Sequence, residues 1–117
     1  MKIIHASEVS NEKKPYGRET KALFEHVFNK PAESIVFYLS SLPTGQFDEH
    51  YHSESEEIIW FPEGGEINVE GTNYRMGPWD AVFLESGERH GFKGNCGKTV
   101  HFAVKIPASK DKVSTET

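Results

Sequence analysis

Short runs of strand-forming residues alternate with turn-forming sequences along most of the chain, and this pattern restricts the fold more than any other feature. The runs occupy residues 34–42, 46–52, 57–62, 66–70, 72–74, 81–84 and 99–106. Sequences that contain glycine or proline separate several of these runs, as PTG does at 43–45 and EGG at 63–65. Many short strands with turns between them predict an all-β barrel or sandwich.

The length of the chain sets the number of domains. With 117 residues it has the size of one domain. Its 36% hydrophobic and 12% aromatic content is not typical of a disordered chain. We expect a single domain at 1–106, with the barrel itself at about 34–106. Residues 107–117 begin with proline and are almost wholly polar, so they are expected to form a disordered tail.

Charge and cysteine content limit the possible partners and location. The net charge is −5 and no basic run is present, which argues against binding to nucleic acid. No apolar run approaches the ~20 residues needed to span a membrane, and the N-terminus lacks the apolar core of a signal peptide. The single cysteine, Cys96, cannot form an intrachain disulfide, which fits a reducing compartment. We therefore expect a cytoplasmic protein.

Two histidines indicate a metal site. His50 and His52 are two residues apart in a predicted strand, so their imidazoles point to the same face. Glu56 and Glu57 begin the next run, and an antiparallel partner strand could bring one carboxylate beside them. Imidazoles with a carboxylate suit a divalent transition metal, here Fe, Mn, Ni, Zn, Co or Cu. The pair alone is also compatible with surface histidines.

The segment 45–65, GQFDEHYHSESEEIIWFPEGG, resembles the first sequence motif of the cupin superfamily, G(X)5HXH(X)3–4E(X)6G. His50 and His52 are followed by four residues and Glu57, and then by six residues and Gly64. Gly45 lies one residue closer to the first histidine than the motif prefers.

The segment 77–95, GPWDAVFLESGERHGFKGN, resembles the second cupin motif, G(X)5PXG(X)2H(X)3N. Gly87, two residues and His90 match in register. Asn95 is one residue late, and Glu85 stands where the motif has proline. The departure at Glu85 is expected to affect only the end of a strand, with an extra carboxylate near the barrel mouth.

The resemblance, which covers about residues 34–106, implies the fold and the metal ligands. The implied fold is an all-β, cupin-type antiparallel β-barrel, also described as a double-stranded β-helix or an RmlC-like jelly roll. The implied ligands of one divalent metal are His50, His52, Glu57 and His90. Glu57 is preferred to Glu56 because its distance to Gly64 fits the motif and because Ile59 and Phe61 then share its inward direction.

Other residues are candidates for a pocket around the metal. Asp48 shares the direction of the two strand histidines and could orient an imidazole. Arg89 could bind a substrate carboxylate, although a surface arginine is the simpler interpretation. The remaining pocket candidates are Tyr38, Phe61 and Phe102, of which the first and last are expected to pack the barrel. His101 is interpreted as an ordinary strand histidine unless the strand faces the other way.

The resemblance leaves the function open between two classes. The first is a metal-dependent enzyme acting on a small oxygenated metabolite, as an isomerase or epimerase, a lyase or a dioxygenase. The alternative is a non-catalytic cupin that binds or senses a small molecule. A homodimer is also expected, with Ile58 and Trp60 directed outward into the contact.

Overall fold

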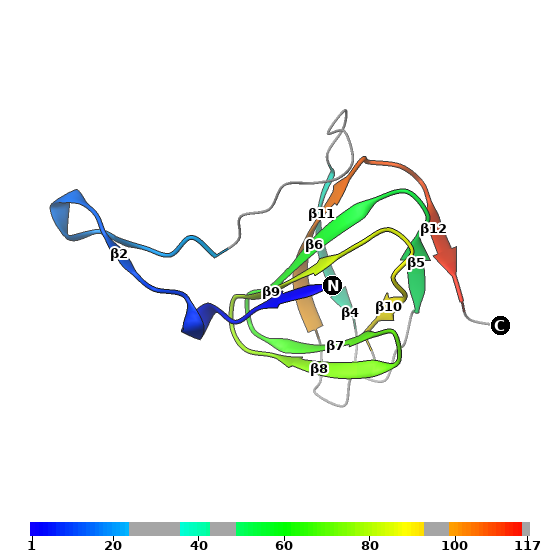
Figure 1. Ribbon diagram of the computed structural model, residues 1–117, viewed down its shortest axis with the longest axis horizontal. Coiled ribbons are helices and arrows are strands. Elements are labelled where there is room, and N and C mark those ends of the chain that lie inside the picture. The colour runs from blue at the N-terminus through cyan, green and yellow to red at the C-terminus, as the bar shows by residue number, and fades with distance from the viewer. Residues whose placement is uncertain (24–35, 43–48, 93–98, 116–117) are drawn as a thin grey trace.

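Two five-stranded antiparallel sheets face each other in the computed structural model, which describes residues 1–23, 36–42, 49–92 and 99–115 (Figure 1). The side chains of residues 20, 36–42 and 99 lie outside this description. The first sheet has the order β1-β9-β6-β11-β4 and the second the order β12-β5-β10-β7-β8. This arrangement confirms the predicted all-β, cupin-type barrel.

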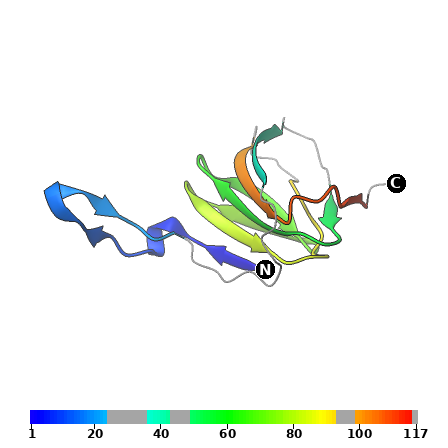
Figure 2. The same cartoon turned by 90° about the horizontal axis from the view of Figure 1, so that it is seen from above.

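The strands of the first sheet are β1 (Lys2–Ile4), β4 (Val36–Leu42), β6 (Glu56–Phe61), β9 (Asp80–Leu84) and β11 (Thr99–Ile106). Those of the second are β5 (His50–His52), β7 (Gly65–Val69), β8 (Thr72–Met76), β10 (His90–Gly91) and β12 (Lys112–Ser114). A separate hairpin pairs β2 (Glu12–Lys13) with β3 (Glu19–Thr20). The 3-10 turn η1 (Ala6–Glu8) precedes this hairpin, and a second turn, η2 (Pro15–Gly17), connects its two strands. Figure 2 shows this hairpin projecting from the barrel. No helix in the described part of the chain is long and apolar enough to cross a membrane.

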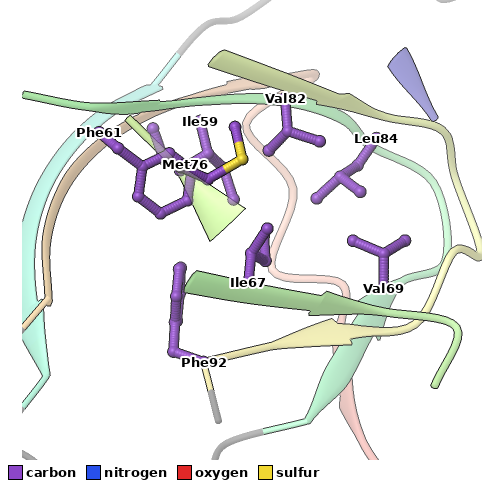
Figure 3. Packing of buried hydrophobic residues seen from close by; sticks show 9 residues of the cluster. Ile59, Phe61, Ile67, Val69, Met76, Val82, Leu84 and Phe92 are labelled. Atoms are coloured by element: carbon purple, nitrogen blue, oxygen red, sulfur yellow. The ribbon is translucent and has the colours of Figure 1, made fainter. Parts of the chain in front are cut away.

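The hydrophobic core fills the space between the two sheets (Figure 3). Ile59 and Phe61 of β6 contribute to it, which confirms their predicted inward direction. The other core residues are Ile67, Val69, Met76, Val82, Leu84, Phe92 and Ala103. Phe61 is wholly buried, and its ring lies edge-on to Phe92 with the centroids 6.0 Å apart. Such aromatic contacts stabilise the barrel through both buried area and ring geometry.

The side chain of Phe102 in β11 points away from the barrel interior, whereas the sequence predicted that it packs inside. The register pairs Ala103 with Ile59, both in the core, and therefore pairs Phe102 with Trp60 on the other face of the sheet. Phe102 is 42% exposed, so it does not line a pocket inside the barrel. The error arose because an alternating strand with apolar residues on both faces does not reveal which face is inside.

Gly64, the last residue of the first motif, is required by its backbone. Its φ of +78° lies in the left-handed region, and a Cβ there would come within 2.7 Å of the carbonyl oxygen of Met76. A side chain would thus be strained in conformation and would also clash with the neighbouring strand β8.

The C-terminal segment differs from the expected disordered tail. Residues Lys112–Ser114 form β12, which pairs with β5 and extends the second sheet. Asp111, just before it, is buried, and its carboxylate accepts hydrogen bonds from the backbone N–H groups of Glu54 and Ser55. These contacts depend on the fold of the remote turn at 53–55, so the polar composition of the tail did not indicate them.

The N-terminal segment is attached to the first sheet by β1, which pairs with β9. Asp80, at the start of β9, accepts hydrogen bonds from the N–H groups of Ala6 and Gly77 at 2.8 and 2.7 Å. Its carboxylate also lies 2.6 Å from Nδ1 of His5. This buried carboxylate therefore connects the N-terminal segment at His5 and Ala6 to the turn at Gly77.

Candidate metal centre

Three imidazoles converge inside the barrel from two neighbouring strands. His50 and His52 come from β5, and His90 comes from β10, where it lies opposite His50 in the register. One nitrogen from each ring belongs to a group whose atoms all lie within 4.8 Å of one another. The ring centroids of His50 and His90 are 4.5 Å apart. His52 and His90 are buried, with 7% and 2% of their surface exposed.

Glu57 reaches these imidazoles from the facing sheet. Its Oε1 lies 3.1 Å from Nε2 of His90, and its Oε2 lies 3.6 Å from Nε2 of His52. The sequence suggested that strand pairing would deliver the carboxylate, but β6 pairs with β9 and β11 rather than with β5. The carboxylate therefore crosses the interior of the barrel. Glu56 alternates to the opposite face of β6 and is buried there.

The hydrogen bond of His90 fixes the direction of its lone pair. Its Nδ1 lies 3.0 Å from the carbonyl oxygen of Glu88, an acceptor, so Nδ1 carries the proton. In a neutral ring, the lone pair of Nε2 then faces the carboxylate of Glu57. The buried nitrogens His90 Nε2, His52 Nδ1 and His52 Nε2 have no hydrogen-bond partner. Two acceptors that face each other in a buried site need a proton or a metal cation between them, and the donor set of imidazoles and a carboxylate fits a metal ion.

The imidazoles also control the ionisation of Glu57. Burial alone would raise its pKa, but interactions with His52 and His90 outweigh burial and lower the pKa to about 2. The carboxylate therefore stays ionised over the whole range in which imidazoles titrate, as a metal ligand must.

The remaining predicted pocket residues lie in different surroundings. Phe61 lies in the core beside the site, whereas Arg89 is exposed because it alternates with the inward-facing His90. Arg89 is thus exposed in the single chain, as the simpler interpretation expected, and a role in binding a substrate carboxylate stays a prediction. Asp48 and the side chain of Tyr38 lie outside the described residues.

His101 lies nearer to the site than the sequence interpretation favoured. It shares the inward direction of Ala103, is 8% exposed and stacks on Phe92 with ring centroids 4.3 Å apart. Burial lowers its pKa, an effect that the negative charge of Glu57 partly opposes. Its Nδ1 is buried without a hydrogen-bond partner. The alternation of β11 showed that His101 and Ala103 lie on the same face of the strand. It did not show that this face points into the barrel.

Comparison with known proteins supports the fold. No family model and no curated protein matches the chain. Among solved structures, the DMSP lyase DddQ from Ruegeria pomeroyi is similar, with a TM-score of 0.63 and 26% identity over 71% of this chain. The match spans 44% of that lyase, so the chain corresponds to less than half of its length.

Two further structures cover different shares of the chain. The Streptomyces nucleoside dehydratase Pac13, solved also with uridine, has a TM-score of 0.61 and 17% identity over 97% of this chain and 89% of its own. A sugar phosphate isomerase of the cupin superfamily from Silicibacter pomeroyi has a TM-score of 0.50 and 17% identity over 62% of this chain and 50% of its own. The facing sheets and these similarities together show that the chain has the barrel fold of the cupin superfamily, whose two sequence motifs it resembles.

Proposed function

We propose that this cupin binds one divalent transition metal through His50, His52, Glu57 and His90 and is an enzyme acting on a small oxygenated metabolite. The observation that carries the proposal is the convergence of three imidazoles and an ionised carboxylate in a buried site, where the lone pair of His90 faces Glu57. Without a cation this arrangement sets two acceptors against each other.

The donor set suits catalysis rather than purely structural binding. Four protein donors would leave open positions on an octahedral ion, and one carboxylate leaves a divalent ion with a net positive charge. When bound, such an ion supplies Lewis acidity toward a substrate with adjacent oxygens, such as a hydroxy acid, keto acid or enediol. Fe, Mn, Ni, Zn, Co and Cu all accept these ligands.

The residues around the site favour reactions that begin with transfer of a proton. Phe61 and Phe92 of the buried hydrophobic core provide an apolar wall. His101 stacks on that wall, and its lowered pKa keeps it neutral near neutral pH, so it can accept a proton. Isomerisation and elimination both need such a base. Two of the similar proteins are described as a lyase and a dehydratase, which supports elimination as the first reaction to test.

Metal analysis followed by a substrate screen tests this proposal. The purified protein is expected to contain close to one equivalent of a divalent transition metal. It is then incubated with small hydroxy acids, keto acids and nucleosides, and products are sought by mass spectrometry. Metal binding with ligand binding but no turnover would instead support the sensor function, and absence of metal would overturn both.

A homodimer is part of the same proposal. Trp60 and Phe102 lie opposite each other in the register on the outer face of the first sheet, and both are at least partly exposed. Ile58 shares that face, but only 5% of its surface is exposed in the single chain, so it adds little area to a contact between subunits. Light scattering should give twice the chain mass of 13.2 kDa. The chain mass itself would refute the dimer.

A further inference from the structure

Asp111 connects the C-terminal segment to the proposed metal centre. The residue is 9% exposed, and its Oδ2 accepts hydrogen bonds from the N–H groups of Glu54 at 2.8 Å and Ser55 at 2.7 Å. Its Oδ1 lies 3.2 Å from Nζ of Lys105 and 3.4 Å from Nδ1 of His52. One carboxylate thus contacts the turn after β5, a buried lysine and a proposed metal ligand.

The position of this carboxylate is fixed from several directions. The backbone oxygen of Asp111 accepts a hydrogen bond from Ser53 at 3.2 Å, and Lys112 lies opposite His52 where β12 pairs with β5. Lys105, itself 5% exposed, also donates to the carbonyl oxygen of Ser109. A carboxylate held by backbone donors and a buried ammonium group has little freedom to turn away from His52.

The tautomer of His52 depends on the groups that surround its ring. Both of its ring nitrogens are buried without a hydrogen-bond partner, and Nε2 faces Glu57 at 3.6 Å. An anionic oxygen near Nδ1 favours the proton on that nitrogen, which leaves the lone pair on Nε2, toward the proposed metal. His90 is arranged in the same way, with the carbonyl oxygen of Glu88 near its Nδ1.

We infer that Asp111 is a positioning residue of the metal centre: from outside both sequence motifs, it holds His52 in the tautomer and orientation that direct Nε2 at the metal. The inference rests on the proposed metal site. It also assigns a role to the C-terminal segment, whose docking completes the wall behind His52. Carboxylates that orient metal-binding histidines typically raise metal affinity, and their loss costs about 10- to 100-fold.

The substitution Asp111→Asn tests this role. An asparagine can keep its oxygen toward the N–H groups of Glu54 and Ser55, but its NH₂ group then faces His52 and favours the wrong tautomer. The affinity for Zn²⁺, measured by competition with a chelator, should fall by about 10- to 100-fold. Independently, ¹⁵N NMR of the imidazoles in metal-free protein should show His52 protonated on Nδ1 in the wild type and shifted toward Nε2 in the variant.

Asp80→Asn provides a matched control. Asp80 is also a buried carboxylate that accepts two backbone N–H groups and contacts a histidine, but its partners are Ala6, Gly77 and His5 rather than a proposed metal ligand. This variant should be destabilised in a similar way and should bind Zn²⁺ as the wild type does. Equal losses of affinity in both variants would overturn the inference, because a general loss of stability would then explain them.

A double variant guards against misfolding. Asp111→Asn leaves the buried ammonium group of Lys105 without its anionic partner, which can be strongly destabilising. Lys105→Met with Asp111→Asn removes both charges and should fold while still binding Zn²⁺ weakly. Absence of Zn²⁺ binding by the wild type would overturn the proposed metal centre itself. Wild-type binding with an unchanged affinity and tautomer in the double variant would overturn the role of Asp111 alone.

Discussion

Nε2 of His90 and Oε1 of Glu57 lie 3.1 Å apart although the two residues belong to opposite sheets. The proposed metal centre therefore spans the interior of the barrel and joins its two layers. A cation bound there would be coordinated from both sheets, so metal binding and the closure of the barrel are expected to support each other.

The ligand assignment predicts a graded series of variants. His50→Ala and His90→Ala should each abolish stoichiometric metal, because each removes a donor, while the fold persists on its hydrophobic core. Glu57→Gln should weaken binding, because a neutral amide replaces the anionic donor. Elemental analysis of the purified variants measures both effects.

Glu56→Gln is the matched control for the adjacent carboxylate. Glu56 is as buried as Glu57 but alternates to the other face of β6, so its replacement should leave the metal in place. Loss of metal in the Glu56 variant with retention in the Glu57 variant would show that the wrong carboxylate has been assigned.

Acidification should release the metal between about pH 7 and pH 5, because protons then compete for imidazole nitrogens. Glu57 does not contribute in this range, since its pKa is lowered to about 2 and it stays ionised. Dialysis at a series of pH values, followed by elemental analysis, gives the release curve. A curve with its midpoint below pH 4 would instead indicate loss of a carboxylate ligand.

His101→Phe should separate catalysis from metal binding. Phenylalanine preserves the stacking on Phe92 but removes the nitrogen that could accept a proton. Metal content should stay at the wild-type level, while kcat on a substrate found by screening should fall by about 10²- to 10⁴-fold, the usual contribution of a general base. Unchanged kcat would exclude His101 from the reaction.

The contact between His5 and Asp80 should make stability depend on pH in a defined direction. The hydrogen bond to Asp80 raises the pKa of His5 above its ordinary value of 6.5. Burial raises the pKa of Asp80, but the hydrogen bonds from His5, Ala6 and Gly77 outweigh it and lower the pKa, so Asp80 remains ionised.

The folded state therefore binds the proton of His5 more tightly than the unfolded state does. The resulting stability is fully present below pH 6.5 and is lost as the pH rises through the folded-state pKa. Wild type should exceed His5→Gln in free energy of unfolding by more at pH 5.5 than at pH 8.5, as measured by urea denaturation. A constant difference across this range would show that the proton on His5 is not linked to folding.

Two motif glycines should differ in their tolerance of alanine. Gly64 and Gly87 both have positive φ, +78° and +84°, which costs about 1–2 kcal/mol for a residue with a side chain. A Cβ at Gly64 also lies 2.7 Å from the carbonyl oxygen of Met76, whereas a Cβ at Gly87 has no neighbour within 4 Å. Denaturation should show a larger loss of stability for Gly64→Ala than for Gly87→Ala, and equal losses would show that the backbone of β8 yields to the side chain.

The sequence by itself determined the longer strands of the barrel, the barrel fold and the residues that meet in the proposed metal centre. It could do so because strand alternation and turn chemistry are local properties, and because the spacing of His50, His52, Glu57 and His90 matches a known pair of motifs. The convergence of the three histidines and the nearby carboxylate followed from that pattern.

Only the tertiary structure decided which groups surround that centre. Whether Phe102 or His101 faces inward depends on the register between β11 and β6, and both faces of that strand carry apolar residues. Asp111 reaches His52 because β12 pairs with a strand some sixty residues earlier in the chain. Such long-range pairing is set by burial and hydrogen bonding in the folded chain, and a polar segment that follows a proline gives no local sign of it.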